Sequence, residues 1–211
     1  MKIAVFGATG GIGKFVVKHA LEKGYEVNAY VRNPHKLQME NKNLKVFVGQ
    51  VSDYDKIKQA IDGCDAVIIA LGISMKFGYE DTSSIIAHKN IIKAMNETNV
   101  KRLIDWSTPS IRSKEDKASF ATIVPGILAS IFLPKAKKVL KEVHNIVVNS
   151  DLDWTIVRFM APKNSPFTNE IKESFGDVKL NFNISREDIA YFMVKQIESS
   201  KYIHSMPIIG S

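Results

Sequence analysis

The residues with the clearest chemical meaning are the glycines of the stretch GATGGIG, which begins at position 7. They follow a short apolar run at 3–6 and open an amphipathic stretch at 11–23, the context in which a glycine-rich turn binds a dinucleotide. Gly7 allows a tight turn, Gly10 lets the backbone approach a pyrophosphate, and Gly13 allows a helix to pack closely on a sheet. Amides at the start of that helix would face the anion. We therefore expect the cofactor to contact Gly7, Thr9, Gly10, Gly11, Ile12 and Gly13.

An arginine follows the second apolar run. In dinucleotide-binding proteins, the residue at this place selects between NAD and NADP. NAD sites usually place a carboxylate about twenty residues after the glycines, where it binds the ribose hydroxyls. This sequence has VRNP there, with Arg32 and no acid between positions 27 and 34. A guanidinium can pair with a 2′-phosphate through two hydrogen bonds and stack on the adenine. The sequence favours NADP(H) over NAD(H); the alternative is that Arg32 is an ordinary loop residue.

The next two apolar runs end in residues that would complete the cofactor site. VGQVSD closes the run at 46–48 and places Gln50 and Val51 where an adenine would rest. IALG closes the run at 66–71 and brings Ala70, Leu71 and Gly72 beside the ribose and nicotinamide. A glycine at a strand end can also be a simple turn, and this alternative stays open for Gly72.

The order of apolar and amphipathic segments predicts the fold class. Nearly all-apolar runs alternate with stretches of helical length, which is typical of a parallel sheet covered on both faces. We expect strands at 3–6, 27–31, 46–48, 66–71, 103–106 and 154–157, and helices at 11–23, 54–61, 83–96, 135–149 and 185–199. SRED, from Ser185, predicts a capped helix start. The chain is thus interpreted as an α/β, Rossmann-type doubly wound sheet in a single domain, 1–211.

Two segments depart from this alternation. Residues 119–134, SFATIVPGILASIFLP, are strongly apolar but carry Pro125 and Gly126 at their centre, so they are expected to be an interrupted insertion over the sheet edge or a hydrophobic contact surface. This segment is too short and too interrupted for a transmembrane helix. Residues 159–211 are expected to form a small C-terminal extension on the substrate side.

The charge, the cysteine count and the motifs of the chain argue against several classes of binding partner. The net charge is +7, but the lysines are scattered and the densest group, at 135–141, follows helical spacing without interleaved aromatics, so no nucleic-acid partner is expected. The glycines are not followed by Lys-Ser or Lys-Thr, which disfavours a P-loop. One cysteine, Cys64, suits a reducing cytoplasm and cannot build a thiolate cluster. We expect a cytoplasmic protein without a metal site or a membrane partner, either a monomer or a weak homodimer.

Several motifs together resemble a known family. GATGGIG with VRNP, then ALG, DWST and SDLDWTIVRFMAP, are similar to the atypical short-chain dehydrogenase/reductase superfamily, in particular its NmrA-like branch and the flavin or biliverdin-IXβ reductases. The resemblance covers most of the chain. It implies a Rossmann-type fold with NADP(H) at the carboxyl edge of the sheet.

The same resemblance suggests catalytic residues. Many members use a Tyr-x-x-x-Lys pair, in which the lysine lowers the pKa of the tyrosine. Here Lys138 has the lysine's place, but Pro134 has the tyrosine's. The flavin-reductase-like members imply instead that Ser107 or Thr108 lines the nicotinamide pocket and that His144 points toward it. Each of these residues also has a purely structural interpretation: a strand-end turn, a structural histidine and a solvent-facing lysine.

The predicted function is an NADPH-dependent oxidoreductase that transfers hydride to a flavin, a quinone or a similar conjugated small-molecule acceptor. Such a transfer needs no strong acid or base, because the cofactor carries the chemistry. Met75, Phe77 and Phe132 could line a pocket for a flat ring. The absent tyrosine equally supports a non-catalytic, NADP(H)-sensing regulatory protein of the NmrA-like type. A sugar-nucleotide epimerase is a third hypothesis, which the missing tyrosine disfavours.

Overall fold

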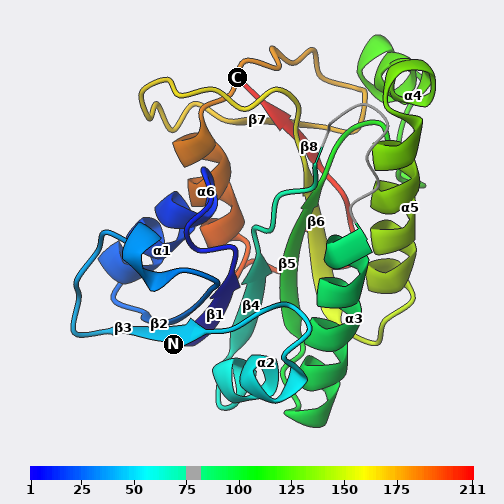
Figure 1. Cartoon of the computed structure of the whole chain (residues 1–211). Coiled ribbons are helices and arrows are strands. Elements are labelled where there is room, and N and C mark those ends of the chain that lie inside the picture. The colour runs from blue at the N-terminus through cyan, green and yellow to red at the C-terminus, as the bar shows by residue number, and fades with distance from the viewer. Residues whose placement is uncertain (75–81) are drawn as a thin grey trace.

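One mixed sheet, covered by helices on both faces, makes up the core of the computed structural model, which describes residues 1–74 and 82–211. Figure 1 shows the arrangement. The strands are β1 (Lys2–Phe6), β2 (Glu26–Val31), β3 (Leu44–Val48), β4 (Ala66–Ile69), β5 (Arg102–Ser107), β6 (Asp153–Arg158), β7 (Lys172–Ser174) and β8 (Ile208–Gly210). The helices are α1 (Gly13–Glu22), α2 (Tyr54–Ile61), α3 (Thr82–Glu97), α4 (Phe120–Phe132), α5 (Pro134–Val148) and α6 (Arg186–Lys195), with a short 3₁₀ turn at Pro34–Lys36.

The strand order places a crevice at the carboxyl edge of the sheet. The order is β3-β2-β1-β4-β5-β6-β8-β7. Strands β2 and β3 are thus added on one side of β1, and β4 and the later strands on its other side, so the order switches between β1 and β4. In open α/β sheets ligands bind at such a switch point, beyond the carboxyl ends of the strands. Helices α1 and α6 pack on one face, and α2, α3 and α5 cover the other, each over its own buried apolar cluster (Figure 1).

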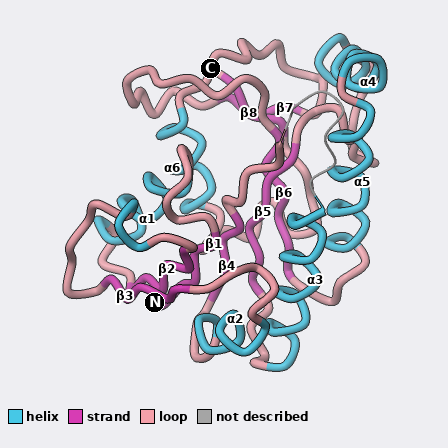
Figure 2. The backbone as a smooth tube through the Cα atoms, in the orientation of Figure 1, coloured by secondary structure: helices cyan, strands magenta, loops and turns pink. Residues whose placement is uncertain are grey.

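The Rossmann-type fold predicted from the sequence is confirmed. All six expected strands and all five expected helices form, with boundaries within about two residues for most of them. Two strands were missed. β8 pairs parallel with β6, and β7 pairs antiparallel with β8, so the sheet has one antiparallel edge strand (Figure 2). Both are only three residues long, which is too short for an alternating pattern to be recognised. The segment 159–211 therefore extends the sheet as well as covering it.

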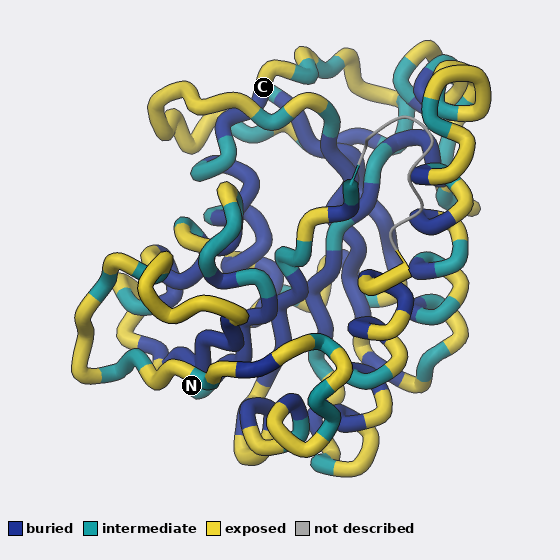
Figure 3. Tube along the Cα trace, in the orientation of Figure 1, coloured by how far each residue is buried: buried dark blue, intermediate teal, exposed yellow. Residues whose placement is uncertain are grey.

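The expected interruption at 119–134 was wrong, because α4 runs through Pro125 and Gly126 as one helix. A proline inside a helix removes one backbone hydrogen bond and usually breaks the helix. Here residues that precede the helix hold its start in place. The Ser119 amide donates to Thr122 Oγ1 at 3.0 Å, and Thr122 Oγ1 donates to the Lys117 carbonyl at 2.7 Å. Most of the helix is exposed (Figure 3). In the part of the chain that the structure describes, no helix is long and apolar enough to cross a membrane.

A capped start fixes α6 as the sequence predicted. Ser185 is the N-cap and its hydroxyl accepts from the Asp188 amide at 2.8 Å. The Asp188 carboxylate in turn accepts from the amides of Thr168 and Asn169. The helix start and the long loop before it are therefore held together.

A buried ion pair anchors the connection between β5 and α4. Arg158, at the end of β6, donates to both carboxylate oxygens of Asp116 at 2.7 and 2.6 Å, and both side chains are fully buried. The same guanidinium donates to the carbonyls of Met206 and Ile111. Every polar contact of the pair is therefore made within the protein, which is what a buried charge requires.

We predict that Asp116→Asn lowers the free energy of unfolding by about 3 to 5 kcal/mol, because it leaves the Arg158 charge buried and unpaired. Denaturant unfolding followed by circular dichroism measures this. Glu97→Gln is the control, since it removes an exposed ion pair with Lys58 at 2.8 Å and should barely move the midpoint. Equal midpoints for the two variants would contradict the anchoring role.

Candidate active site

The glycine turn after β1 is built around two backbone contacts that exclude any side chain. Gly7 has φ +83°, and a Cβ on it would lie 2.6 Å from the Ala70 carbonyl oxygen. A Cβ on Gly13 would lie 2.0 Å from the Gly7 carbonyl oxygen. Both glycines thus have the roles expected from the sequence, the turn and the close helix packing. They also explain why β1, α1 and β4 meet at the switch point.

The start of α1 is left available to an anion. In the described structure no side chain caps this helix, whose N-cap residue is Ile12. The first amides of a helix need partners and carry the positive end of the helix dipole, so a pyrophosphate fits there. The Gly10 amide donates to the Gly7 carbonyl at 2.9 Å, which closes the turn beneath this position.

A first cavity, of about 260 Å³, lies over the glycine turn. Tyr30, Val31, Gly49, Ser83 and Ser84 line it together with nine residues predicted to bind the cofactor. These nine are Gly7, Thr9, Gly10, Arg32, Gln50, Val51, Ala70, Leu71 and Gly72. The structure therefore gathers the predicted residues from the ends of β1, β2, β3 and β4 in one place.

The loop expected to support the adenine is held in place by three hydrogen bonds. The Tyr30 hydroxyl donates to the Gln50 carbonyl at 2.8 Å, and burial raises the pKa of Tyr30 to about 12, so this hydroxyl keeps its proton. The Gln50 amide donates to Asp53, and the Asn90 side chain donates to the Val51 carbonyl at 2.9 Å. The sequence analysis did not find Tyr30 and Asn90, because their contacts join distant parts of the chain.

A second cavity, of about 480 Å³, continues from the first and shares Gly10, Ala70 and Gly72 with it. It contains two further loop residues of the prediction, Gly11 and Ile12, whereas Gly13 lines neither cavity and packs against the Gly7 backbone. It also contains the predicted Thr108. Lining residues that the sequence analysis missed include Ile73, Trp106, Phe159, Met160, Arg186 and Met193.

Two aromatic rings form one wall of the second cavity. The rings of Trp106 and Phe159 are stacked with centroids 5.4 Å apart. The indole N–H of Trp106 donates to the Leu71 carbonyl at 2.8 Å, which ties the wall to the end of β4. Both residues lie within the quoted motifs DWST and RFMAP, but neither motif by itself indicates which side chain faces the cavity.

Arg186 places a cation beside the glycine turn. A Cβ on Gly11 would meet the Arg186 Cδ and Nε, both at 3.0 Å, so this side chain lies directly against the loop. Its guanidinium also donates to Asn164 Oδ1 at 2.7 Å. The residue follows the N-cap of α6, far away in the sequence, and only the tertiary fold brings it here.

A third cavity, of about 320 Å³, lies beneath α4 and shares Thr108, Leu133 and Met160 with the second. Its lining is almost wholly apolar and includes the predicted contact Phe132. The Thr108 hydroxyl is 2.6 Å from the Ser110 hydroxyl, and the Lys137 amine donates to the Gly126 carbonyl and the Ser130 hydroxyl. Thr108, Ser110 and Lys137 are therefore the polar residues that line this cavity.

The structure separates the four predicted catalytic residues. Thr108 alone lies at the junction of the second and third cavities. Ser107 is buried, and among the described residues its hydroxyl has no hydrogen-bond partner and lines no cavity of the site. Lys138 is exposed, and its neighbour Lys137 faces the third cavity instead. Met75 and Phe77 lie outside the described residues.

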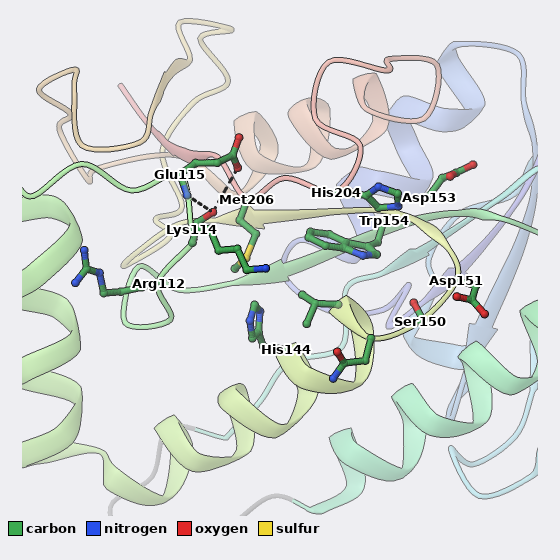
Figure 4. Close-up of a pocket in the computed structure, with 13 residues that line it drawn as sticks. Arg112, Lys114, Glu115, His144, Ser150, Asp151, Asp153, Trp154, His204 and Met206 are labelled. Atoms are coloured by element: carbon green, nitrogen blue, oxygen red, sulfur yellow. Dashed lines mark hydrogen bonds between the residues drawn. The ribbon is translucent and has the colours of Figure 1, made fainter.

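His144 lies in a different cavity, away from the cofactor residues. Figure 4 shows it facing a hollow that Arg112, Lys114, Trp154 and Met206 also line. The volume of this hollow is about 850 Å³. Burial and the neighbouring Arg158 charge lower the pKa of His144, so its ring is neutral at pH 7. The structure thus does not bring His144 to the cleft in which Thr108 lies.

A buried charged pair supports the floor of the first cavity. His88 Nε2 lies 3.2 Å from Asp105 Oδ2, as an ion pair rather than an aligned hydrogen bond, and His88 Nδ1 lies 2.6 Å from the Ser84 carbonyl. Burial opposes the charged form of His88, but the Asp105 carboxylate and the Ser84 carbonyl raise its pKa overall. Each ring nitrogen thus faces an oxygen, which fixes α3 against β5 next to Ser84.

A comparison with known families matches this geometry. The sequence model of a family described as NAD(P)H-binding matches residues 7–200. The chain belongs to this family. The match contains the glycine turn and every other residue assigned above to the three cavities.

Individual relatives agree with the assignment. The chain is 33% identical over 115 residues to cinnamoyl-CoA reductase 1 of Petunia hybrida, a match that covers 50% of the chain and 34% of the reductase. The chain thus spans about a third of that relative's length. A putative epimerase from Bacteroides thetaiotaomicron has a TM-score of 0.81 and 26% identity, with 99% of this chain and 96% of that one covered.

A third similar protein is ChuY, an anaerobilin reductase from Escherichia coli O157:H7. It has a TM-score of 0.74 and 16% identity, and the match covers 100% of this chain and 97% of that one. The resemblance predicted from the sequence is thereby confirmed at the level of Rossmann-type, NAD(P)-binding reductases and epimerases.

We predict that Gly13→Ala lowers the free energy of unfolding by about 3 kcal/mol, because its Cβ meets backbone that cannot move aside. Gly11→Ala is the matched control, since its Cβ meets only the flexible end of Arg186. Thermal unfolding of both variants measures the difference. If Gly13→Ala melted at the parental temperature, the proposed contact with Gly7 would be wrong.

Proposed function

We propose that the protein is an NADPH-dependent reductase that passes hydride to a flat, conjugated acceptor such as a flavin or a quinone. The observation that carries this proposal is the apolar third cavity, which joins the second at Thr108, Leu133 and Met160. A flat ring held beneath α4 would lie against the part of the cleft that holds the nicotinamide. The bound cofactor supplies the hydride, so the protein must mainly position the two rings and exclude water.

The residues present fit the cofactor. The start of α1 and the glycine turn suit a pyrophosphate, because no side chain of the described residues caps the first amides of this helix. Arg186 adds a positive charge beside the same turn. Arg32 is exposed at the far end of the first cavity, where its guanidinium could bind a 2′-phosphate. Of these contacts, that of Arg32 supports the preference for NADPH, since the others concern the pyrophosphate that both cofactors share.

The acceptor side offers a hydroxyl instead of a strong acid. Thr108 is held by Ser110, so its hydroxyl could donate to a polar atom of an acceptor ring. The stacked rings of Trp106 and Phe159 close the wall of the second cavity and exclude water from the reacting atoms. A flavin or quinone needs no more than this, since its own ring stabilises the added electrons.

A non-catalytic NADP(H) sensor is the second candidate. One observation favours it: among the described residues that line the second and third cavities there is no tyrosine. Pro134 begins α5 where many members of the superfamily carry that residue. Binding of NADPH without turnover of any acceptor would decide for the sensor.

We also infer a cytoplasmic protein that acts as a monomer or a weak homodimer. Burial raises the pKa of the single thiol, Cys64, to about 11. A thiol of this kind resists oxidation and does not form disulfides between molecules. Size-exclusion chromatography with light scattering measures the oligomeric state.

We expect the purified protein to oxidise NADPH when FMN, riboflavin or a benzoquinone is present, and much more slowly without an acceptor. Stopped-flow absorbance of NADPH measures this. Thr108→Val should reduce the rate constant for hydride transfer more than the affinity for NADPH, because the hydroxyl faces the acceptor side. A panel of acceptors without any turnover would exclude the reductase.

Arg32→Glu should weaken NADPH binding about 100-fold and NADH binding much less, because a carboxylate repels the 2′-phosphate and can accept from ribose hydroxyls. Arg186→Ala is the matched comparison, since its guanidinium lies beside the part that both cofactors share and its loss should weaken both equally. Fluorescence titration with each cofactor measures the affinities. Equal losses of the two affinities in Arg32→Glu would remove the argument for NADPH.

A further inference from the structure

The lining of the third cavity limits which molecules can bind there. Among the described residues that line it, only Thr108, Ser110 and Lys137 are polar, and all the others have apolar side chains. A lining of this kind takes the hydration of a charged ligand away without replacing it. At about 320 Å³, the cavity is also at the small end of the range for ligand sites, which is about 300 to 1,000 Å³. It therefore suits a small, uncharged ring.

The three polar side chains of this cavity are already partly engaged. The hydroxyls of Thr108 and Ser110 are 2.6 Å apart, so one of them donates to the other. The Lys137 amine donates to the Gly126 carbonyl at 2.8 Å and to the Ser130 hydroxyl at 2.7 Å. These bonds leave one hydroxyl hydrogen of the pair and one of the three ammonium hydrogens to donate elsewhere. Two separate donors suit carbonyl oxygens better than a phosphate, which needs several donors at once.

The cavity reaches the molecular surface along α4. Leu128 and Phe132 line it and are 48% and 61% exposed. On the α5 side it is lined by Ala136 and Leu140, which are each only 3% exposed. The apolar lining thus runs from buried side chains of α5 to exposed side chains of α4. A chain of methylene groups on this surface would remove its own carbons and two large side chains from water.

At its Thr108 end the third cavity adjoins the rest of the cleft. Thr108, Leu133 and Met160 line both the second and the third cavity. The second cavity in turn shares Gly10 and Gly72 with the first, which lies over the glycine turn. A ring at Thr108 would therefore be nearest to a bound cofactor, and a substituent on that ring would point toward α4. The order of the cavities thus favours an acceptor with a reactive end and an apolar end.

We propose that the third cavity binds an uncharged quinone ring with an alkyl chain, the ring at Thr108 and the chain against Leu128 and Phe132. This narrows the acceptor of the proposed reductase and rests on that function. Hydride from NADPH brings two electrons and one hydrogen to the quinone and leaves NADP⁺, and a proton from water completes the hydroquinone. The hydroxyl pair and Lys137 are the donors to the quinone oxygens. FMN fits less well, because its phosphate is charged and the Lys137 amine already donates twice.

Steady-state kinetics with a series of 2-alkyl-1,4-benzoquinones tests this proposal. The alkyl chain is lengthened from one to five carbons at saturating NADPH, and FMN is the charged comparison. We expect KM for the quinone to fall about threefold with each added methylene, because each methylene leaves water on binding. The value of kcat should change little, since the reacting ring stays the same. KM for FMN should be at least about tenfold higher than that for the five-carbon quinone.

Two double variants locate the alkyl chain on α4. Leu128→Ser/Phe132→Ser should remove most of the dependence of KM on chain length, because the chain then meets polar side chains. Ile127→Ser/Ile131→Ser is the matched control and should keep the parental dependence. These two isoleucines are on the same helix and are 54% and 61% exposed, but neither is among the described residues that line the cavity. Circular dichroism of both variants shows whether the fold is retained.

Calorimetric titration with 4-alkylphenols in the presence of NADP⁺ separates this proposal from the proposed function. These probes have a ring, an oxygen and an alkyl chain, as the quinones do, but they cannot accept hydride. Their affinity should rise with chain length in the parent and in Ile127→Ser/Ile131→Ser, and not in Leu128→Ser/Phe132→Ser. With that result, the absence of turnover with every acceptor would reject the reductase and leave the alkyl site supported.

Two results would overturn the alkyl site. The first is turnover of the quinones with a KM that does not depend on chain length, or that depends on it equally in the two double variants. This result would leave the reductase standing. The second is a lower KM for FMN than for the five-carbon quinone, which would assign the cavity to a charged flavin.

Discussion

The contact between Gly7 and the backbone at the end of β4 is the constraint on which the site depends. Because a Cβ at Gly7 would lie 2.6 Å from the Ala70 carbonyl, the chain can turn there only without a side chain. Gly13, the first residue of α1, is under the same constraint, because a Cβ there would lie 2.0 Å from the Gly7 carbonyl oxygen. These contacts bring α1 over the gap between β1 and β4, where the strand order reverses. The position of the anion site thus follows from steric exclusion in the backbone.

The part of the cleft that contains Thr108 and α4 depends on a different kind of interaction. There the chain leaves β5 through a loop that the buried Arg158–Asp116 pair holds in place. That loop carries Thr108 and leads to α4, so one ion pair orients both the hydroxyl and the cover of the third cavity. A buried pair holds geometry well but contributes little net stability, because each charge loses its hydration. The cleft thus combines a turn that backbone contacts fix with a second half that one ion pair holds.

The residues that the sequence groups by local signals do lie together in the structure. The glycine turn and the strand ends with Arg32, Gln50 and Ala70 are fixed by neighbours in the chain, and they do line one cavity. Other residues depend on tertiary contacts: Arg186 comes from the start of α6, and His144 belongs to another cavity. Helix α4 was misjudged because Pro125 breaks isolated helices, whereas here Thr122 and the cavity wall hold it. The positions of Arg186, His144 and α4 depend on burial and long-range contacts, which cannot be inferred from composition or local sequence patterns.

Gly11 differs from the other three glycines of the turn. A Cβ there would meet only the side chain of Arg186, whereas at Gly7, Gly10 and Gly13 it would meet backbone. Substitution at position 11 is therefore decided by what stands at position 186. Because the far end of an arginine side chain can swing aside, position 11 is the place in this turn where a small side chain fits without moving backbone. Such a change displaces the Arg186 guanidinium and leaves the turn itself intact.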